Sequence, residues 1–261
     1  MMRLLRSRRN RWSTVWQLSK YLPRETRGHI SASLGHRYIR PQVSAVPKQN
    51  LRPYVLSSRC LLGDRVRYDG RDKRQNWIDE VKNHLRLLSW CPEVEAGLAI
   101  PRPPMDMYLR DDGLVEVRVE GDPTDVGPRI RETLEMLSVT KLQQPLDGAI
   151  LKSKSPSCAL TDGRIEGGPG VVHFGRGVFV AALLKRWPTL PCVDDFTLQD
   201  PQRRAQFISA VRLHHDLRTG REVEVDRNAT ALYDRFRRGF ELPNGNFFSA
   251  LCAEGILNVS V

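Results

Sequence analysis

The sequence GAILKSKSPSC, residues 148–158, establishes the architecture expected for the whole chain. Its first five residues, 148–152, form a short apolar run of the kind that fills a fully buried strand. A polar Ser/Lys/Pro segment then leads to Cys158. Strands buried on both faces are typical of parallel sheets. A cysteine just beyond the carboxyl end of such a strand would lie at the edge where these sheets bind ligands.

Two earlier segments repeat this pattern of a strand followed by a cysteine. YVLSS (residues 54–58) leads into Cys60, and LLSW (residues 87–90) leads into Cys91. The three cysteines are 31 and 67 residues apart. Because the carboxyl ends of parallel strands meet at one edge of a sheet, the three thiols can still meet in space. We refer to Cys60, Cys91 and Cys158 as the cysteine triad.

Between the expected strands, apolar residues recur at the spacing of one face of a helix. The expected helices cover residues 75–85, 125–142, 179–187 and 201–217. Asp200 before Pro201 has the chemistry of an N-cap. Residues 105–109 and 114–119 flank an Asp-Gly turn and predict a hairpin, while the glycine-rich segments within 167–177 are expected to form a flexible loop. The sequence therefore predicts an α/β fold with a mainly parallel sheet, helices on both faces, and a small β-hairpin insertion in a single three-layer domain.

The net charge of +11 comes entirely from the first fifth of the chain. Residues 1–53 hold twelve Lys/Arg and one acid (12 − 1 = +11), and residues 54–261 hold 29 of each sign. A segment rich in Arg and Ser and almost free of acids is typical of an organellar transit peptide. We expect residues 1–52 to direct the protein to mitochondria, with a plastid or cytoplasmic location as alternatives. The competing interpretation is a disordered basic arm that binds RNA or an anionic surface.

The remaining domain boundaries follow from the same patterns. Residues 53–218 are expected to form the α/β domain, and residues 219–261 a C-terminal extension of unknown role. No apolar run approaches the ~18 residues that a membrane span needs, so no membrane partner is expected. Residues 54–261 have no net charge, which does not favour tRNA as a partner, although a local basic patch would permit tRNA binding.

The number and surroundings of the cysteines limit the kinds of metal site that the triad can form. Five cysteines, an odd number, do not suggest a disulfide framework. Structural zinc takes closely spaced Cys/His pairs, but the chain has no C-x-x-C, and none of its six histidines adjoins the triad. Thiolate-only ligation suits an iron–sulfur cluster with one iron left open. Cys192 and Cys252 lack similar surroundings and are expected to be small buried apolar side chains.

The segments around the triad resemble one known family. SRCLLGDRVRYDG (residues 58–70), CPEVEAGL (91–98) with PRPP (101–104), and LKSKSPSC (151–158) carry the resemblance. They are similar, in the same order, to the motifs of the bacterial 2-thiouracil desulfidase family, long catalogued as domain of unknown function 523. The resemblance covers about residues 53–217.

This resemblance implies an α/β domain in which Cys60, Cys91 and Cys158 hold a [4Fe–4S] cluster. It implies that the fourth iron takes sulfur from a small thiolated base or nucleoside, such as 2-thiouracil or thiouridine, and that sulfide is released. On matching positions, Glu93 would be the acid/base carboxylate and Ser155 the serine that works beside it. The alternatives are a helix-terminal charge for Glu93 and a loop-stabilising hydroxyl for Ser155. A cluster also implies the iron–sulfur assembly machinery as a partner.

Three positions depart from the family pattern. Arg59 precedes the first cysteine where a small residue is usual, Arg71 replaces a glycine, and Ala159 follows the third cysteine in place of glycine. A positive φ at residue 159 would be costly for alanine, so the loop is expected to differ there. The alternative to a desulfidase is a non-enzymatic module whose triad holds a cluster or another metal for sensing or for RNA contact.

Overall fold

In the computed structural model, residues 52–142 and 145–221 are described, and every structural statement below concerns them. The expected N-terminal extension up to residue 51, the C-terminal extension beyond residue 221, and Cys252 lie outside this part of the chain. No described helix is long and apolar enough to cross a membrane.

A parallel four-stranded sheet forms the centre of the described chain. Its strand order is β2-β1-β5-β8. The strands are β1 (Tyr54–Ser58), β2 (Arg86–Trp90), β5 (Gly148–Leu151) and β8 (Cys192–Asp194). Every residue of the two central strands, β1 and β5, is buried. Because both faces of these strands are covered, their sequences are apolar or small throughout rather than alternating with polar residues.

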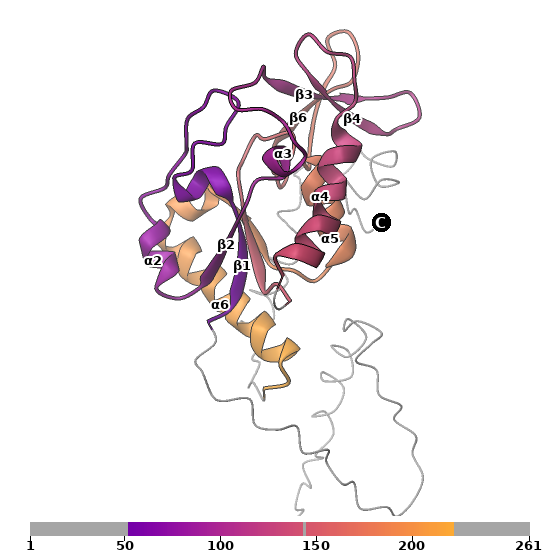
Figure 1. Cartoon of the computed structure of the whole chain (residues 1–261). Coiled ribbons are helices and arrows are strands. Elements are labelled where there is room, and N and C mark those ends of the chain that lie inside the picture. Colours follow the sequence, from indigo (N-terminus) through magenta and orange to yellow (C-terminus); the bar gives the residue numbers. More distant parts are fainter. Residues whose placement is uncertain (1–51, 143–144, 222–261) are drawn as a thin grey trace, which may run out of the picture. The chain divides into compact units, whose positions relative to one another are not determined.

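Helices cover both faces of this sheet, as the sequence predicts (Figure 1). Their bounds are η2 (Arg59–Leu62, a 3-10 helix), α2 (Ile78–Lys82), α3 (Pro92–Glu95), α4 (Gly127–Thr140), α5 (Val178–Arg186), η3 (Thr197–Gln199, a 3-10 helix) and α6 (Pro201–Arg218). On one face, the apolar side chains of α4 and α5 pack against β1, β2, β5 and β8, and on the other face those of α2 and α6 pack against β1, β5 and β8. The predicted cap of α6 is confirmed, since the Asp200 carboxylate accepts the N–H of Gln202 at 2.7 Å.

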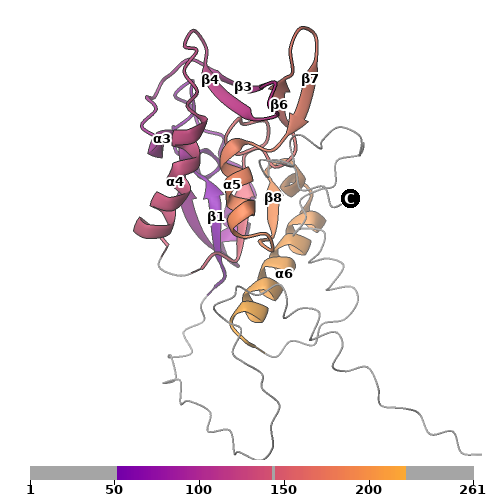
Figure 2. The ribbon, with the colours of Figure 1, turned by 90° about the vertical axis from the view of Figure 1, so that its right-hand side faces the viewer.

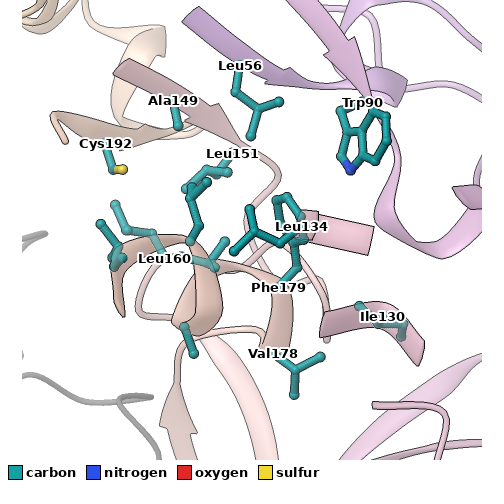
Figure 3. Packing of buried hydrophobic residues seen from close by; sticks show 14 of the residues in the cluster. Leu56, Trp90, Ile130, Leu134, Ala149, Leu151, Leu160, Val178, Phe179 and Cys192 are labelled. Atoms are coloured by element: carbon teal, nitrogen blue, oxygen red, sulfur yellow. The ribbon is translucent and has the colours of Figure 1, made fainter. Parts of the chain in front are cut away.

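The first of these two cores is continuous across the sheet and helices (Figure 3). Leu56 and Leu151 of the sheet lie against Leu134 of α4 and Phe179 of α5. Cys192 belongs to the same cluster and is 1% exposed. The expectation that it is a small buried apolar side chain is therefore confirmed.

A second sheet corrects the predicted fold. The hairpin of β3 (Met105–Leu109) and β4 (Val115–Val119) is confirmed, but it belongs to a mixed sheet of order β4-β3-β6-β7 (Figure 2). The added strands are β6 (Gly163–Glu166) and β7 (Val172–Gly175), and β6 pairs in parallel with β3. The predicted glycine-rich loop is the turn at residues 167–171, but the strands on either side of it were not predicted. Four-residue strands with one buried apolar side chain, Ile165, give too short a pattern to predict, and Gly168 and Gly170 supply the positive φ of the turn between them.

The amino end of the parallel sheet is tied to α6 by one buried carboxylate. Asp147, fully buried before β5, accepts the Tyr54 N–H at 2.8 Å, His215 Nδ1 at 2.9 Å and Arg218 Nε at 2.9 Å. Burial by itself would raise the pKa of Asp147. Hydrogen bonds from His214, Tyr54 and His215, together with the charge of Arg218, lower this pKa to about 2 instead.

Candidate active site

The cysteine triad lies at the carboxyl edge of the parallel sheet, behind three neighbouring strands. Cys60 is the second residue of η2, which follows β1 directly, and Cys91 stands between the end of β2 and the start of α3. Ser58 and Trp90 are paired in register, so these two segments leave the sheet at the same level. Cys158 follows β5 by seven residues. The predicted placement of all three cysteines beyond strand ends is confirmed.

The three thiols are buried and influence one another. All are free, and they are 8, 9 and 6% exposed in chain order. Burial, followed by the neighbouring Cys91, raises the pKa of the Cys60 thiol to about 12. Burial and then Glu93 raise the pKa of Cys91 to about 11, and the same two causes hold the pKa of Cys158 well above its ordinary value. The charges of Cys91 and Cys60 raise the pKa of Cys158 further.

This donor set suits a cluster better than a single ion. Within residues 52–142 and 145–221, no group of three or more His, Cys, Asp or Glu side chains could hold one metal ion. A single zinc ion needs every sulfur about 2.3 Å from the same point, whereas a cluster takes each thiolate on a different iron. Cys192 offers no fourth thiolate, because it lies in the apolar core on β8. Among the described residues, three buried thiols and no fourth cysteine beside them fit an iron–sulfur cluster with one iron free of protein ligands.

The loop that carries Cys158 is clamped by the start of α5. The N–H groups of Gly177 and Val178 donate to the carbonyls of Ala159 (2.9 Å) and Pro156 (3.0 Å). Gly177 packs so closely that a Cβ built on it would lie 2.3 Å from the carbonyl carbon of Ser157. Glycine is therefore required here by contact with the backbone next to Cys158.

Ala159 does not adopt the backbone conformation that would be costly for alanine. Among the described non-glycine residues, Lys154 has a positive φ, of 58°, and Ala159 does not. The unusual backbone conformation in this loop thus falls four residues before Cys158, and alanine at position 159 carries no conformational cost. That the loop differs from the family's at residue 159 stays a prediction, with which the φ of Ala159 is compatible.

Glu93 and Ser155 lie together beside the triad. Ser155 Oγ lies 3.4 Å from Glu93 Oε1, in position to donate to it. The same hydroxyl oxygen accepts the N–H groups of Ser157 at 3.2 Å and Cys158 at 3.1 Å. Glu93, the second residue of α3, raises the pKa of all three thiols through its charge. The alternative role of Ser155 as a loop-stabilising hydroxyl is thus compatible with its place beside Glu93, because one hydroxyl makes both sets of contacts.

Further polar residues lie at the site, and two of them, Ser58 and Arg102, were not assigned a role from the sequence. Ser58 Oγ accepts the N–H of Lys152 at 3.0 Å, and a hydrogen bond from the Ser58 hydroxyl lowers the pKa of Cys158. Lys152 Nζ lies 3.1 Å from the buried carboxylate of Asp195, and its charge lowers the pKa of Cys60. Arg102 forms an ion pair with Glu93. Ser58 and Arg102 stand within the motifs quoted above, but their contacts depend on segments that approach only in the folded chain.

Two of the departures from the family pattern lie at the surface. Arg59 pairs with Asp64 at 2.7 Å, and both side chains are more than one third exposed. Arg71 is 76% exposed and pairs with Asp69, which also binds Arg67. Neither arginine contacts the triad in the interactions that the structure shows, so both leave the three thiols undisturbed.

The sequence is similar to known proteins. No curated protein matches the sequence. Among solved structures, a [4Fe–4S]-dependent thiouracil desulfidase, TudS, is 33% identical over 56% of this chain and 93% of that chain, with a TM-score of 0.43. The sequence model of the 2-thiouracil desulfurase family matches residues 55–195, a segment that contains the whole triad, Glu93 and Ser155. Because this match spans more than half of the chain, the protein belongs to the 2-thiouracil desulfurase family.

Proposed function

We propose that this protein is a [4Fe–4S]-dependent desulfidase that removes sulfur from a thiolated pyrimidine and releases sulfide. The observation that carries the proposal is the buried cysteine triad with the hydrogen-bonded Glu93–Ser155 pair beside it, in a chain of this family. Cys60, Cys91 and Cys158 would hold the cluster. When bound, the cluster supplies an iron without a protein ligand, which can take the sulfur of the substrate.

Glu93 and Ser155 provide the proton chemistry. Replacing C=S by C=O consumes one water, whose oxygen becomes the carbonyl oxygen on the ring carbon and whose two protons leave with the sulfur as hydrogen sulfide. The Glu93 carboxylate can accept a proton from water and return it to the departing sulfur or to a ring nitrogen. The oxygen of Ser155 is occupied by two loop N–H groups, which directs its own proton toward Glu93 Oε1. Ser155 therefore fixes the orientation in which Glu93 exchanges protons.

The decisive experiment uses the full-length protein reconstituted anaerobically with iron and sulfide. The expected result is a cluster bound to each chain, loss of the thiocarbonyl absorbance of 2-thiouracil or 4-thiouridine, and stoichiometric release of sulfide. A thiolated tRNA assayed in parallel separates a small substrate from a macromolecular one. Full cluster occupancy without turnover of any thiolated pyrimidine would contradict the enzyme and favour a non-enzymatic cluster-binding module.

A substitution at Glu93 tests the proton chemistry within the same assay. Glu93→Gln should keep its cluster and lose about 10²–10⁴-fold in turnover, because an amide does not exchange a proton at working pH. Glu95→Gln, two residues further along α3, is the matched control and should turn over normally. Equal turnover by the two variants would show that Glu93 is not the acid/base group.

We also propose that residues 1–52 direct the protein to mitochondria, where it would meet the iron–sulfur assembly machinery. The support is compositional, since this segment carries the whole excess of positive charge. Residues 1–52 fused to a fluorescent protein should enter mitochondria, and the same segment with its arginines replaced by glutamine should not. A cytosolic or plastid signal from the native segment would contradict the proposed location.

A further inference from the structure

Arg102 is a buried arginine whose side chain ends against the carboxylate of Glu93. Its side chain is 4% exposed, and it forms an ion pair with Glu93 Oε2. Arginine is almost never buried to this extent unless it is paired. The pair therefore accounts for a charged side chain that would otherwise be costly in this place.

The rest of Arg102 is fixed by the backbone of two loops. Its Nη1 donates to the carbonyl oxygens of Ala99 at 3.0 Å and Val66 at 3.4 Å. The backbone N–H of Arg102 donates to the carbonyl of Tyr68 at 2.9 Å. A guanidinium group is planar and presents its donors in a rigid fork. Because one arm of the fork is held by main-chain carbonyls, the direction of the other arm toward Glu93 is fixed as well.

The two oxygens of Glu93 have different partners. Oε2 binds Arg102, and Oε1 lies 3.4 Å from Ser155 Oγ. A continuous chain of contacts thus runs from the two loops through Arg102 and Glu93 to Ser155, and from Ser155 to the N–H of Cys158. Removing the guanidinium group would leave Oε2 without the partner that selects the orientation of the carboxylate.

We propose that Arg102 is a positioning residue of the desulfidase site, which holds Glu93 so that Oε1 faces Ser155. The inference rests on the proposed function, because it assigns Arg102 a part in that reaction. Arg102 acts through Glu93 rather than on the substrate, since its Nη2 pairs with Glu93 and its Nη1 donates to main-chain carbonyls. A misplacement of about 1 Å in a catalytic group can cost about 10²-fold in rate.

The kinetic test compares Arg102→Met with the wild type, both as reconstituted full-length protein assayed with 2-thiouracil. The expected result is a kcat about 10²-fold lower, a KM within about twofold of the wild type, and an unchanged iron content. Arg102→Lys should recover part of the kcat, because an ammonium group can pair with Glu93 but cannot reproduce the rigid fork. An unchanged kcat, or a raised KM at constant kcat, would overturn the positioning role.

Arg204 provides a matched control. It is also buried, pairs with a carboxylate (Nε to Glu80 Oε2, 3.0 Å), and donates Nη1 to the carbonyls of Leu198 (2.8 Å) and Gln199 (3.0 Å). It lies on α6, against α2, and contacts none of the site residues. Arg204→Met should lower thermal stability but leave kcat unchanged. An equal loss of kcat in the Arg204 and Arg102 variants would overturn the inference, because general destabilisation would then explain both.

A second readout does not depend on activity. Arg102→Met should lower the Tm of the full-length protein by about 5–10 °C, because it leaves the partly buried Glu93 charge without a partner. Adding Glu93→Gln should recover at least half of this loss, and adding Glu95→Gln should recover none. If the wild type releases no sulfide from any thiolated pyrimidine, the proposed function fails, but the Tm recovery still decides whether Arg102 and Glu93 act as a pair. Absence of recovery would overturn the pairing.

Discussion

Replacing Gly177 by alanine should displace the loop that carries Cys158. The backbone of Gly177, at φ −65° and ψ 151°, is equally open to alanine, so the substitution adds no conformational strain of its own. The effect comes from contact alone. The added Cβ would lie 2.3 Å from the carbonyl carbon of Ser157, 2.5 Å from its oxygen and 2.7 Å from the nitrogen of Cys158.

The size of the displacement follows from these distances. Non-bonded carbon atoms prefer a separation of about 3.5–4.0 Å, so the loop and the start of α5 must separate by at least about 1 Å. That movement stretches the hydrogen bonds that Gly177, Val178 and Phe179 donate to loop carbonyls at 2.9 to 3.2 Å. Overpacking of this kind costs about 1–3 kcal/mol. For a domain of this size, the loss corresponds to a Tm lower by roughly 2–12 °C.

The assay is iron and sulfide content after anaerobic reconstitution, measured beside the Tm. Metal–ligand distances tolerate only about 0.2 Å, so Gly177→Ala should bind less than half of the wild-type iron. Gly148→Ala is the control, because its Cβ would lie 2.7 Å from Val211 Cγ2 at the opposite end of β5, away from the triad. It should lower the Tm yet keep its iron. Wild-type iron content in Gly177→Ala, or equal iron loss in both variants, would refute the reasoning.

Three further predictions concern other parts of the chain. Replacing any one member of the cysteine triad by alanine should abolish the visible absorbance of the cluster or reduce it severely, whereas Cys192→Ala should preserve it; equal loss from all four variants would contradict the division between site and core. Ser155→Ala should destabilise the protein by about 1–3 kcal/mol in urea unfolding, because two loop N–H groups lose their acceptor. Ser157→Ala should not, since the buried Ser157 hydroxyl has no partner among the described residues. Folding lowers the pKa of Asp147 from 3.8 to about 2. Its ionised carboxylate therefore contributes about 2 kcal/mol to the free energy of unfolding above pH 4, and this contribution is lost as the pH falls toward 2. Urea unfolding at pH 5 and pH 2 should show this loss in the wild type and not in Asp147→Asn, and parallel pH dependence of the two proteins would be the contrary result.

The positions of the strands and of the triad could be predicted because the information is local. β1 and β5 are short apolar runs bounded by polar turns, and each cysteine follows its strand closely in sequence. The order of parallel strands then brings their carboxyl ends together whatever the length of the crossovers. Asp200 was equally predictable, since an N-cap depends on its nearest neighbours alone.

The contacts that shape the site could not be predicted because they join segments far apart in sequence. Gly177 appeared as part of a flexible glycine-rich loop, and only its approach to Ser157 gives the reason for a glycine. Arg102 stands between two prolines and has one local partner, the Ala99 carbonyl, whereas its contacts to Val66 and Glu93 require three segments to fold together. The second sheet was missed for a related reason. β6 pairs with β3 across more than fifty residues, and four-residue strands carry too little periodicity to predict that pairing.

The wide separation of the cysteine triad along the chain has a consequence for how the protein would acquire the proposed cluster. In zinc fingers, closely spaced ligands bind metal in an unfolded chain, and binding drives folding. Here the three thiols come from segments behind β1, β2 and β5, and they share a site only after β1 has paired with both neighbours. Synthesis must therefore proceed past residue 158, and the central sheet must form, before three ligands are available. A protein that donates the cluster would transfer it to the folded chain, and the folding of the sheet would decide when cluster insertion can occur.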